Sequence, residues 1–448
     1  MMPASSAHKP ICVFACRWCS LIGAERAGRE RLPLPPEIRL LPVPCAGSVS
    51  LDMLLHAFAS GAVGVAVLGC HLGGCRHEDA NRDAHARLTV LADLLETSGI
   101  GRNRLCISWG TAHEAAQYAH LMNDFARSLQ DLPPLPEFFH IPKNQAEALT
   151  AVPERSGKPL PLSGEEDTAQ DLTLRAAVIQ TLEKGHMVLA LGRVQSGVIP
   201  DLFVQKEDVQ ALVSGPKFPL AKLAGSILRE RVQGSLKPNG IHQSLREQAF
   251  ALRNHGLSVA CRACDARALY QMADLHQFPR ELLDLIAIPC STEQQKACCC
   301  TRPQWPGDNK VLSHEGSITC EGDIDWLAQF SRCVQCHRCR IACPVCVCPD
   351  CALDDSATHP SSMQPFSSPM LYHLTRALHV ADCCVQCGAC QEACPQGLPL
   401  LQLHQSVAVS MENLGYKSGE GMISPLRGSR HKNEVPQWQD SLKGGMHA

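Results

Sequence analysis

Two runs of cysteine in this sequence share the spacing C-x2-C-x2-C-x3-C followed by proline. Their members are Cys333, Cys336, Cys339 and Cys343 in the first run, and Cys384, Cys387, Cys390 and Cys394 in the second. Three thiolates at intervals of three residues can wrap a tight loop around one face of an iron–sulfur cubane. The repeated spacing therefore predicts two 4Fe–4S clusters.

The fourth cysteine of each run decides how the ligands divide. In two-cluster ferredoxins this cysteine ligates the other cluster, so the expected ligands of cluster I are Cys333, Cys336, Cys339 and Cys394. The expected ligands of cluster II are Cys343, Cys384, Cys387 and Cys390. Zinc is the alternative, because C-x2-C pairs also build tetrahedral thiolate sites. The sequence twice places three closely spaced cysteines before a Cys-Pro pair. This repeated pattern favours iron–sulfur clusters over zinc.

Five more cysteines follow three predicted strands near the N-terminus: Cys16, Cys19, Cys45, Cys70 and Cys75. The strands are expected at 11–15, 38–43 and 62–69, where the sequence is apolar and β-branched. In a parallel α/β sheet, ligands bind in the crevice outside the carboxyl ends of the strands. Five thiols at that edge predict a metal site. Cys12 and Cys106, which lie inside predicted strands, are expected in the core.

The elements that carry these cysteines suggest three folded regions. A fourth strand at 104–109 and helical periodicity at 48–61 and 79–99 complete a β-α-β alternation, which implies a parallel sheet covered by helices. Further on, strands are expected at 186–192 and 257–262, and helices at 173–185 and 280–288. The fold class is α/β, with an N-terminal flavodoxin-like parallel-sheet domain, a second α/β or α+β domain, and a C-terminal ferredoxin-type dicluster α+β domain.

The expected domain boundaries follow from changes in composition. They are 1–131 for the N-terminal domain, 132–166 for a Pro-rich linker, 167–310 for the second domain, 311–408 for the dicluster domain, and 409–448 for a mostly disordered tail. The first cysteine run is also flanked by Arg332, Arg338 and Arg340. Their charge is expected to favour reduction of cluster I over cluster II.

Composition narrows the class of protein. The chain has 448 residues, 45% of them apolar, and a net charge of −3, which argues against an electrostatic nucleic-acid binder. It has 26 cysteines but no apolar leader typical of secretion and no stretch long enough to span a membrane. We therefore expect reduced, metal-binding cysteines in a cytoplasmic protein of anaerobic metabolism.

The N-terminal segments "VFACRWCSLIGAERAG", "IRLLPVPCAGSV" and "AVLGCHLGGCRHEDANRDA" resemble the delta subunit of methyl-viologen-reducing hydrogenase. The resemblance covers residues 11–130. It implies a small α/β domain with one 2Fe–2S cluster that passes electrons between a hydrogenase and heterodisulfide reductase. Four of the five N-terminal cysteines are then ligands, and which one is spare stays open. The family often has an adjacent cysteine pair in its first loop, whereas this chain has Ala15 before Cys16.

The middle segments "KFPLAKLAGSIL", "SVACRACDARALYQMADLHQ" and "ELLDLIAIPCS" are similar in pattern to beta subunits of formate dehydrogenase and of deazaflavin-reducing hydrogenase. That resemblance implies a site for a flavin such as FAD, although no G-x-G-x-x-G follows a strand. The group Cys346, Cys348 and Cys351, with a thiol from the cysteines between Cys261 and Cys300, could hold a further metal centre. Auxiliary thiols beside the clusters are the alternative.

Together these patterns predict an iron–sulfur electron-transfer subunit of a hydrogenase, formate dehydrogenase or heterodisulfide reductase type of complex. It would relay single electrons between a 2Fe–2S and two 4Fe–4S clusters, with no catalytic residues of its own. The partners that the resemblance implies are a heterodisulfide-reductase-A-like flavoprotein and a component of a hydrogenase or formate dehydrogenase. Two alternatives remain: a reductase whose middle domain binds FAD and exchanges electrons with a soluble carrier, and a zinc-stabilised scaffold.

Overall fold

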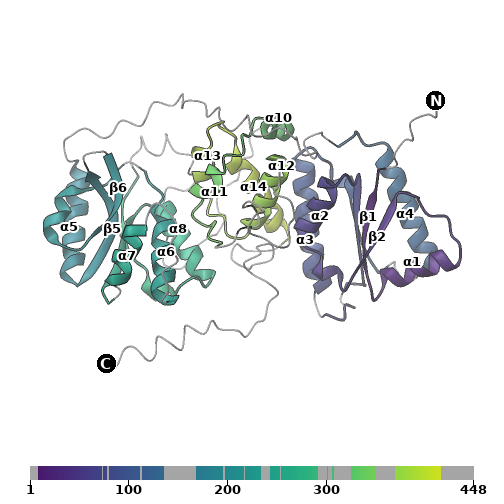
Figure 1. Cartoon of the computed structure of the whole chain (residues 1–448), viewed down its shortest axis with the longest axis horizontal. Coiled ribbons are helices and arrows are strands. Elements are labelled where there is room, and N and C mark those ends of the chain that lie inside the picture. Colours follow the sequence, from purple (N-terminus) through teal and green to yellow (C-terminus); the bar gives the residue numbers. More distant parts are fainter. Residues whose placement is uncertain are drawn as a thin grey trace.

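The computed structural model describes residues 9–72, 74–77, 80–110, 114–135, 168–194, 197–215, 217–233, 243–252, 254–290, 300, 305–306, 324–348, 351, 353 and 369–414. The predicted linker and tail fall mostly outside these ranges. Within them the chain forms two sheets and a helical region (Figure 1).

The first sheet is parallel and has the strand order β2-β1-β3-β4. Its strands are β1 Ile11–Cys16, β2 Ile38–Val43, β3 Gly64–Gly69 and β4 Leu105–Trp109. One face packs against α1 Ser20–Arg29 and α4 Ala115–Gln130, and the other against α2 Leu51–Ala59 and α3 Ala80–Thr97. Because β1 and β3 lie in the centre, nearly all their side chains are buried.

The second sheet is mixed. Strands β5 His186–Val194, β8 Gly256–Cys261 and β9 Asp284–Ala287 run parallel, while β6 Gly197–Phe203 and β7 Leu212–Val213 pair with β5 in the antiparallel sense. Helix α5 Ala169–Glu183 covers one face. The opposite face is covered by α6 Leu220–Gln233, α7 Gln243–Ala251 and α8 Ala263–Asp274.

One predicted helix in this region was wrong. Residues 280–288 form the short 3-10 turn Arg280–Leu282 and the edge strand β9. The apolar run "LLDLIAI" is only seven residues long and lies between Pro279 and Pro289. A short apolar run bounded by prolines fits a strand of a parallel sheet as well as it fits a helix.

The cysteine motifs lie in a region whose described elements are helices. These are α10 Trp326–Ser331, α11 Arg338–Ala342, α12 Pro369–His379, α13 Ala389–Glu392 and α14 Leu400–Asn413. Helix α14 continues past residue 408, where the dicluster domain was expected to end.

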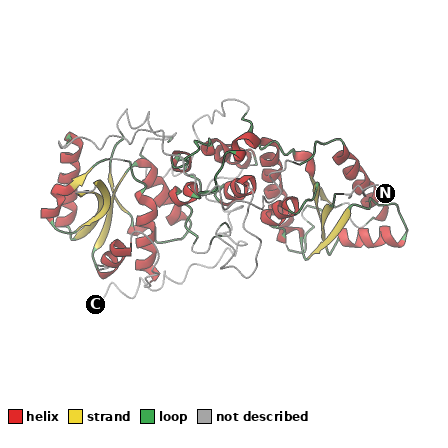
Figure 2. Ribbon diagram, turned by 45° about the horizontal axis from the view of Figure 1, so that its top comes forward, coloured by secondary structure: helices red, strands yellow, loops and turns green. Residues whose placement is uncertain are grey.

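This helical region lies between the two sheet regions, although it comes last in the chain (Figures 1 and 2). On one side α12 and α14 share a continuous apolar core with α2 and α3 of the first sheet region. On the other side Cys343, Val345 and Val385 pack into the core of the second sheet region. Burial of these apolar faces against each other holds the three regions together.

Polar contacts reinforce both junctions. His379 lies 3.1 Å from each carboxylate oxygen of Asp52 on the first side. On the second side Lys217 pairs with Glu392 at 2.8 Å, and Lys222 donates to the carbonyls of Arg340 and Ile341.

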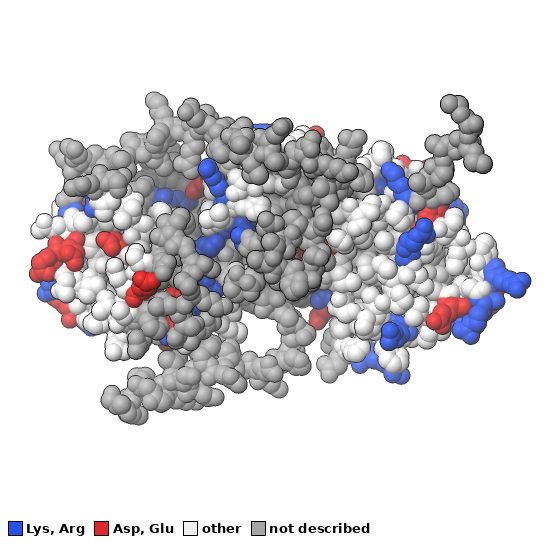
Figure 3. Space-filling view, viewed as in Figure 1, with Lys and Arg blue, Asp and Glu red and all other residues white. Residues whose placement is uncertain are grey.

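The α/β fold class is confirmed by the two sheets and their covering helices. On the face drawn in Figure 3, basic and acidic side chains are interspersed over the described surface. Across the described residues, every helix is too short or too polar to cross a lipid bilayer.

Candidate metal centres

The thiols of the five N-terminal cysteines form two neighbouring groups. Cys70 Sγ lies 3.8 Å from Cys16 Sγ and 3.0 Å from Cys19 Sγ. Cys45 Sγ and Cys75 Sγ lie 3.6 Å apart. Two thiolates on one tetrahedral metal with bonds near 2.3 Å are separated by about 3.8 Å. The arrangement therefore suits two metal atoms, each reached by one group of thiols.

The ends of the strands and the turns after them position these thiols. Cys16 is the last residue of β1, Cys19 immediately precedes α1, and Cys45 caps a short 3-10 turn. Backbone N–H groups point at the sulfurs: Gly47 N donates to Cys45 Sγ at 3.3 Å, and His77 N donates to Cys75 Sγ at 3.4 Å. Such N–H groups are the donors that an iron–sulfur cluster uses for its sulfurs.

The loop after β3 is anchored by a buried asparagine. Asn81 Nδ2 donates to the carbonyls of Cys70 and His71 at 3.1 and 2.7 Å. His71 in turn lies against Gly110, whose φ is +89° and where a Cβ atom would come within 2.0 Å of the imidazole. Gly110 is therefore needed for both its backbone conformation and its lack of a side chain.

Two of these thiols, those of Cys45 and Cys70, have raised pKa values. Burial, followed by the neighbouring Cys75 and Cys16, raises the pKa of Cys45 to about 11 despite a hydrogen bond from Gly47. Burial and the adjacent Cys19 and Cys16 raise the pKa of Cys70 still further. A bound metal reverses this preference, because a coordinating thiol loses its proton. The donor set therefore fits a metal cluster.

The rim of this centre carries two exposed side chains. The guanidinium of Arg76 lies 4.0 Å from the centroid of the Trp18 ring. Trp18 is 45% exposed, and it lies between Cys16 and Cys19 in the sequence. This cation–π contact therefore joins the first cysteine loop to the loop that carries Cys75.

In the helical region, four of the motif cysteines surround one small cavity. Its lining includes Cys333, Cys336, Cys339 and Cys394. Burial, together with the nearby Cys339, Cys394 and Cys336, raises the pKa of Cys333 to about 12, although a hydrogen bond from Gln335 N acts in the opposite direction. Three of these cysteines belong to the first motif and the fourth to the second. This is the set expected for cluster I, and its role as a ligand set remains a prediction.

The other four motif cysteines form a second group. Cys387 is partly buried, and its pKa is raised by burial and by the neighbouring Cys343, Cys390 and Cys384. Cys343 differs from the rest, because a hydrogen bond from Cys346 and the charges of Arg376 and Lys222 hold its pKa below the usual range. These four cysteines are the set expected for cluster II, which likewise remains a prediction.

The two loops repeat the same backbone conformation. Gln335 and Gln386 stand just before the second cysteine of each motif and have φ of +48° and +53°. His337 and Gly388 stand just after it and have φ of +56° and +75°. These left-handed residues turn successive N–H groups toward the inside of the loop. In the first loop Gln335 N donates to Cys333 Sγ at 3.4 Å.

Helix α12 supplies further groups that sequence reasoning did not single out. His373 Nε2 lies 3.3 Å from Cys333 Sγ, and Tyr372 Oη lies 3.7 Å from Cys339 Sγ. Burial, followed by the charges of Arg376 and His337, lowers the pKa of His373 to about 3. His373 is therefore neutral at pH 7. The only signal in the sequence was a helical segment between the two motifs.

The remaining described cysteines are auxiliary or undecided. Cys346 hydrogen-bonds Cys343, and Cys351 lies close enough to Cys348 to raise its pKa. In the second sheet region, Cys261 and Cys300 both lie close to Cys264. Cys298, Cys299 and Cys320 lie outside the described residues. Among the described residues, no group of three His, Cys, Asp or Glu side chains has the geometry that would bind a single metal ion.

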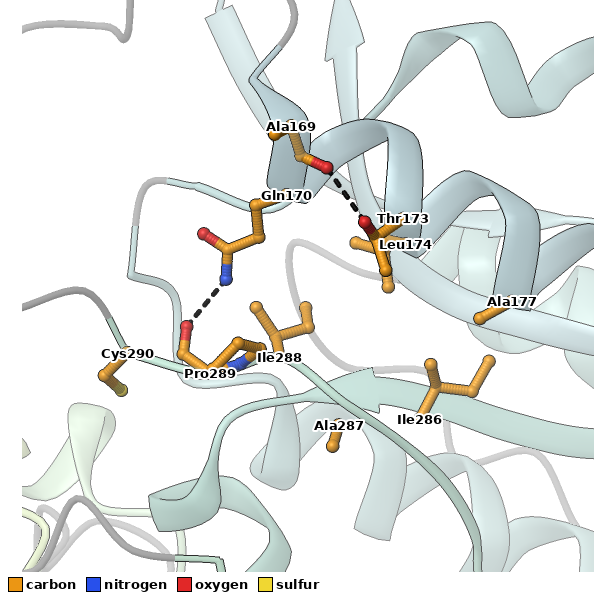
Figure 4. Close-up of a pocket in the computed structure, with 10 residues that line it drawn as sticks. All are labelled: Ala169, Gln170, Thr173, Leu174, Ala177, Ile286, Ala287, Ile288, Pro289 and Cys290. Atoms are coloured by element: carbon orange, nitrogen blue, oxygen red, sulfur yellow. Dashed lines mark hydrogen bonds between the residues drawn. The ribbon is translucent and has the colours of Figure 1, made fainter.

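A separate pocket of about 410 Å³ lies between α5 and the edge strand β9 (Figure 4). Its walls are mostly apolar, and they include Leu174, Ile286 and Ile288. Two polar side chains that line it form hydrogen bonds with the main chain. Gln170 donates to the Pro289 carbonyl, and Thr173 donates to the Ala169 carbonyl. The volume falls in the range of small-molecule sites.

Comparison with known proteins bears on the first sheet region. Residues 11–133 match the family model of the methyl-viologen-reducing hydrogenase delta subunit. The iron-sulfur subunit of the F420-non-reducing hydrogenase of Archaeoglobus profundus is 36% identical over 124 residues, which are 28% of this chain and 90% of that protein.

Two further relatives match this chain over a smaller share of their own length. A component of the ferredoxin/F(420)H(2)-dependent CoB-CoM heterodisulfide reductase of Methanosarcina acetivorans is 31% identical over 135 residues, 29% of this chain and 17% of that protein. The beta subunit of the F420-dependent formate dehydrogenase of Methanocaldococcus jannaschii is 30% identical over 103 residues, 22% of this chain and 27% of that protein. The resemblances expected from the sequence are confirmed.

Proposed function

This chain belongs, through residues 11–133, to the methyl-viologen-reducing hydrogenase delta subunit family, and from that premise we propose that it is an iron–sulfur electron-transfer subunit of an oxidoreductase complex. It holds one 2Fe–2S cluster on the N-terminal cysteines and two 4Fe–4S clusters on the paired motifs. Clusters bound there would accept and release single electrons.

The observation that carries the proposal is the exchange of one cysteine between the two motifs. Cys394 lies with the first three cysteines of the first motif, and Cys343 lies with the first three of the second. Two sites that borrow a ligand from each other lie side by side, which suits passage of an electron from one to the other. The protein's part is to exclude water, to direct N–H groups at the sulfurs and to hold the sites in one rigid unit.

The proposed partners follow from the relatives. We propose that this chain binds two partners, a heterodisulfide-reductase-A-like flavoprotein and a component of a hydrogenase or formate dehydrogenase. The names of the similar proteins support this proposal. The N-terminal centre is the proposed point of contact with one of them. Trp18, Leu72 and Arg76 are exposed beside its cysteines.

A reductase that binds FAD is the second candidate, and the pocket beside β9 is the observation that favours it. The pocket lies at the carboxyl end of β9, in the parallel part of the mixed sheet, where ligands of α/β folds bind. Its apolar walls suit a flat ring.

The test is anaerobic reconstitution of the full chain with iron and sulfide, followed by metal, sulfide and flavin analysis. The proposal expects roughly ten irons per chain, from one two-iron and two four-iron clusters, with a brown visible spectrum. Released flavin in stoichiometric amount supports the FAD reductase instead. A colourless protein loaded with zinc would contradict both.

A further inference from the structure

Arg376 lies at the centre of the helical region, on α12 between the two cysteine motifs. Only 1% of its surface is exposed. Its Nη1 lies 2.7 Å from His404 Nε2, and its Nη2 donates to the Cys339 carbonyl at 3.2 Å. Burial and the adjacent guanidinium lower the pKa of His404 well below its usual range, so that this partner is neutral. A buried guanidinium with neutral partners is costly unless negative charge lies close by.

Cysteines of both motifs lie close to this guanidinium. Cys346, Cys343, Cys390 and Cys339 are near enough for a thiolate at these positions to act on Arg376 electrostatically, and the Cys339 carbonyl accepts a hydrogen bond from its Nη2. Cys339 belongs to the proposed ligands of cluster I, whereas Cys343 and Cys390 belong to those of cluster II. One fixed positive charge therefore lies next to ligands of both proposed clusters.

We infer that Arg376 is a counter-charge shared by the two 4Fe–4S clusters, and that it holds both midpoint potentials above the values they would have beside a neutral residue. The inference rests on the proposed function. Reduction adds an electron to a cluster, and a nearby positive charge in a water-excluded site stabilises the reduced form. Because the charge is common to both sites, one substitution should move both potentials in the same direction.

Two other cations provide matched comparisons. Lys222 lies near Cys343, a proposed ligand of cluster II, and near Cys346. Its influence should therefore fall on cluster II alone. Arg338 is exposed at the start of α11 beside Cys339. Water screens an exposed charge, so its removal should leave both potentials nearly unchanged.

The experiment is an EPR-monitored redox titration of the full, anaerobically reconstituted chain and of Arg376→Gln, Lys222→Gln and Arg338→Gln, with iron content measured on each. Arg376→Gln is expected to lower both midpoint potentials by a tenfold or larger change in the reduction equilibrium, which is about 59 mV for one electron. Lys222→Gln should lower one potential, and Arg338→Gln neither. Fully loaded Arg376→Gln with unmoved potentials, or with only one potential moved, overturns the inference.

Two further variants keep the test decisive if Arg376→Gln does not assemble. Arg376→Met removes the charge with a chain of similar length, and Arg376→Lys keeps the charge but shortens the stem. Iron loss from both neutral variants with full loading of Arg376→Lys supports the inference, because charge and not shape is then required. Iron loss from all three, including Arg376→Lys, overturns it. A wild-type chain that takes up no iron would instead reject the proposed function.

Discussion

His379 Nε2 lies 3.1 Å from both carboxylate oxygens of Asp52, and this pair joins the helix between the cysteine motifs to the first sheet region. Both side chains are mostly buried. The pair lies at the edge of the apolar interface that α2, α3, α12 and α14 form. We expect this junction to unfold together with the two regions that it connects.

Asp52→Asn should lower the free energy of unfolding by about 0.5–1 kcal/mol, because it replaces the carboxylate that His379 contacts at the margin of a buried interface. Urea denaturation of the full chain measures this change. Asp124→Asn is the matched control, since Asp124 pairs with Arg127 and His120 on the exposed side of α4. Equal losses in the two variants would show that burial at the junction adds nothing.

Crossed ligation predicts a specific pattern of iron loss. Cys343→Ser and Cys387→Ser should each remove about four irons, and the double variant should remove no more than either single one, because both residues serve one cluster. The double variant Cys343→Ser with Cys336→Ser should remove about eight, because these residues serve different clusters. Iron analysis of purified protein reads the result directly. The reverse pattern would mean that each motif holds its own cluster.

The N-terminal centre should need three of its five cysteines without exception. Cys45 and Cys75 form one group, and Cys70 is the member of the other group that lies next to both Cys16 and Cys19. Serine variants of Cys45, Cys70 and Cys75 should each lose the 2Fe–2S spectrum. One of the two variants Cys16→Ser and Cys19→Ser should keep the 2Fe–2S spectrum, because one of these two cysteines is expected to be the spare one. Retention of a normal spectrum in Cys70→Ser would show that the grouping is wrong.

Asp265 should make the stability of the second sheet region depend on pH. Burial, only partly offset by a hydrogen bond from Ala221 and by Lys217 and Arg262, raises its pKa to about 6. A carboxyl whose folded pKa lies above its unfolded value of about 3.9 stabilises the fold most below pH 4 and loses this contribution as pH rises through 6.

Asp265→Asn keeps an acceptor for Ala221 N but cannot ionise. Its free energy of unfolding should therefore lack the decline of up to about 2 kcal/mol that the wild-type residue contributes between pH 4 and pH 7. Urea denaturation at four pH values in that range measures the difference. Parallel pH profiles for the two proteins would mean that Asp265 ionises as freely as in the unfolded chain.

Much of the fold could be predicted from patterns within short stretches of the sequence. The four strands of the first sheet were predicted because each is a short apolar run in alternation with helical segments, although only β1 and β3 are nearly fully buried. The helix predicted at 280–288 was wrong because a short apolar run has no decisive period. Pairing with β8 across the sheet makes it a strand, and that partner is distant in the sequence.

The cysteines of the candidate sites could be predicted from spacing, whereas their surroundings could not. Arg376 contacts the Cys339 carbonyl across a separation of 37 residues, and its helix carries no motif. Of the arginines that the sequence did suggest, Arg332 and Arg338 are exposed and Arg340 is half-buried, and their effect on the potential of cluster I remains a prediction. A buried charged side chain acts more strongly on a buried site than an exposed one does, because water screens the exposed charge. Which arginine is buried depends on the folded structure and could not be predicted from the motif.

The position of the helical region between the two sheet regions bears on the synthesis of the chain. A ribosome completes the N-terminal and middle regions first, and such regions fold as they emerge. Until the last part of the chain is made, the apolar faces of α2, α3, α6 and α8 have no cover. The newly made chain therefore exposes these apolar faces, and is prone to aggregate, until the helical region is made.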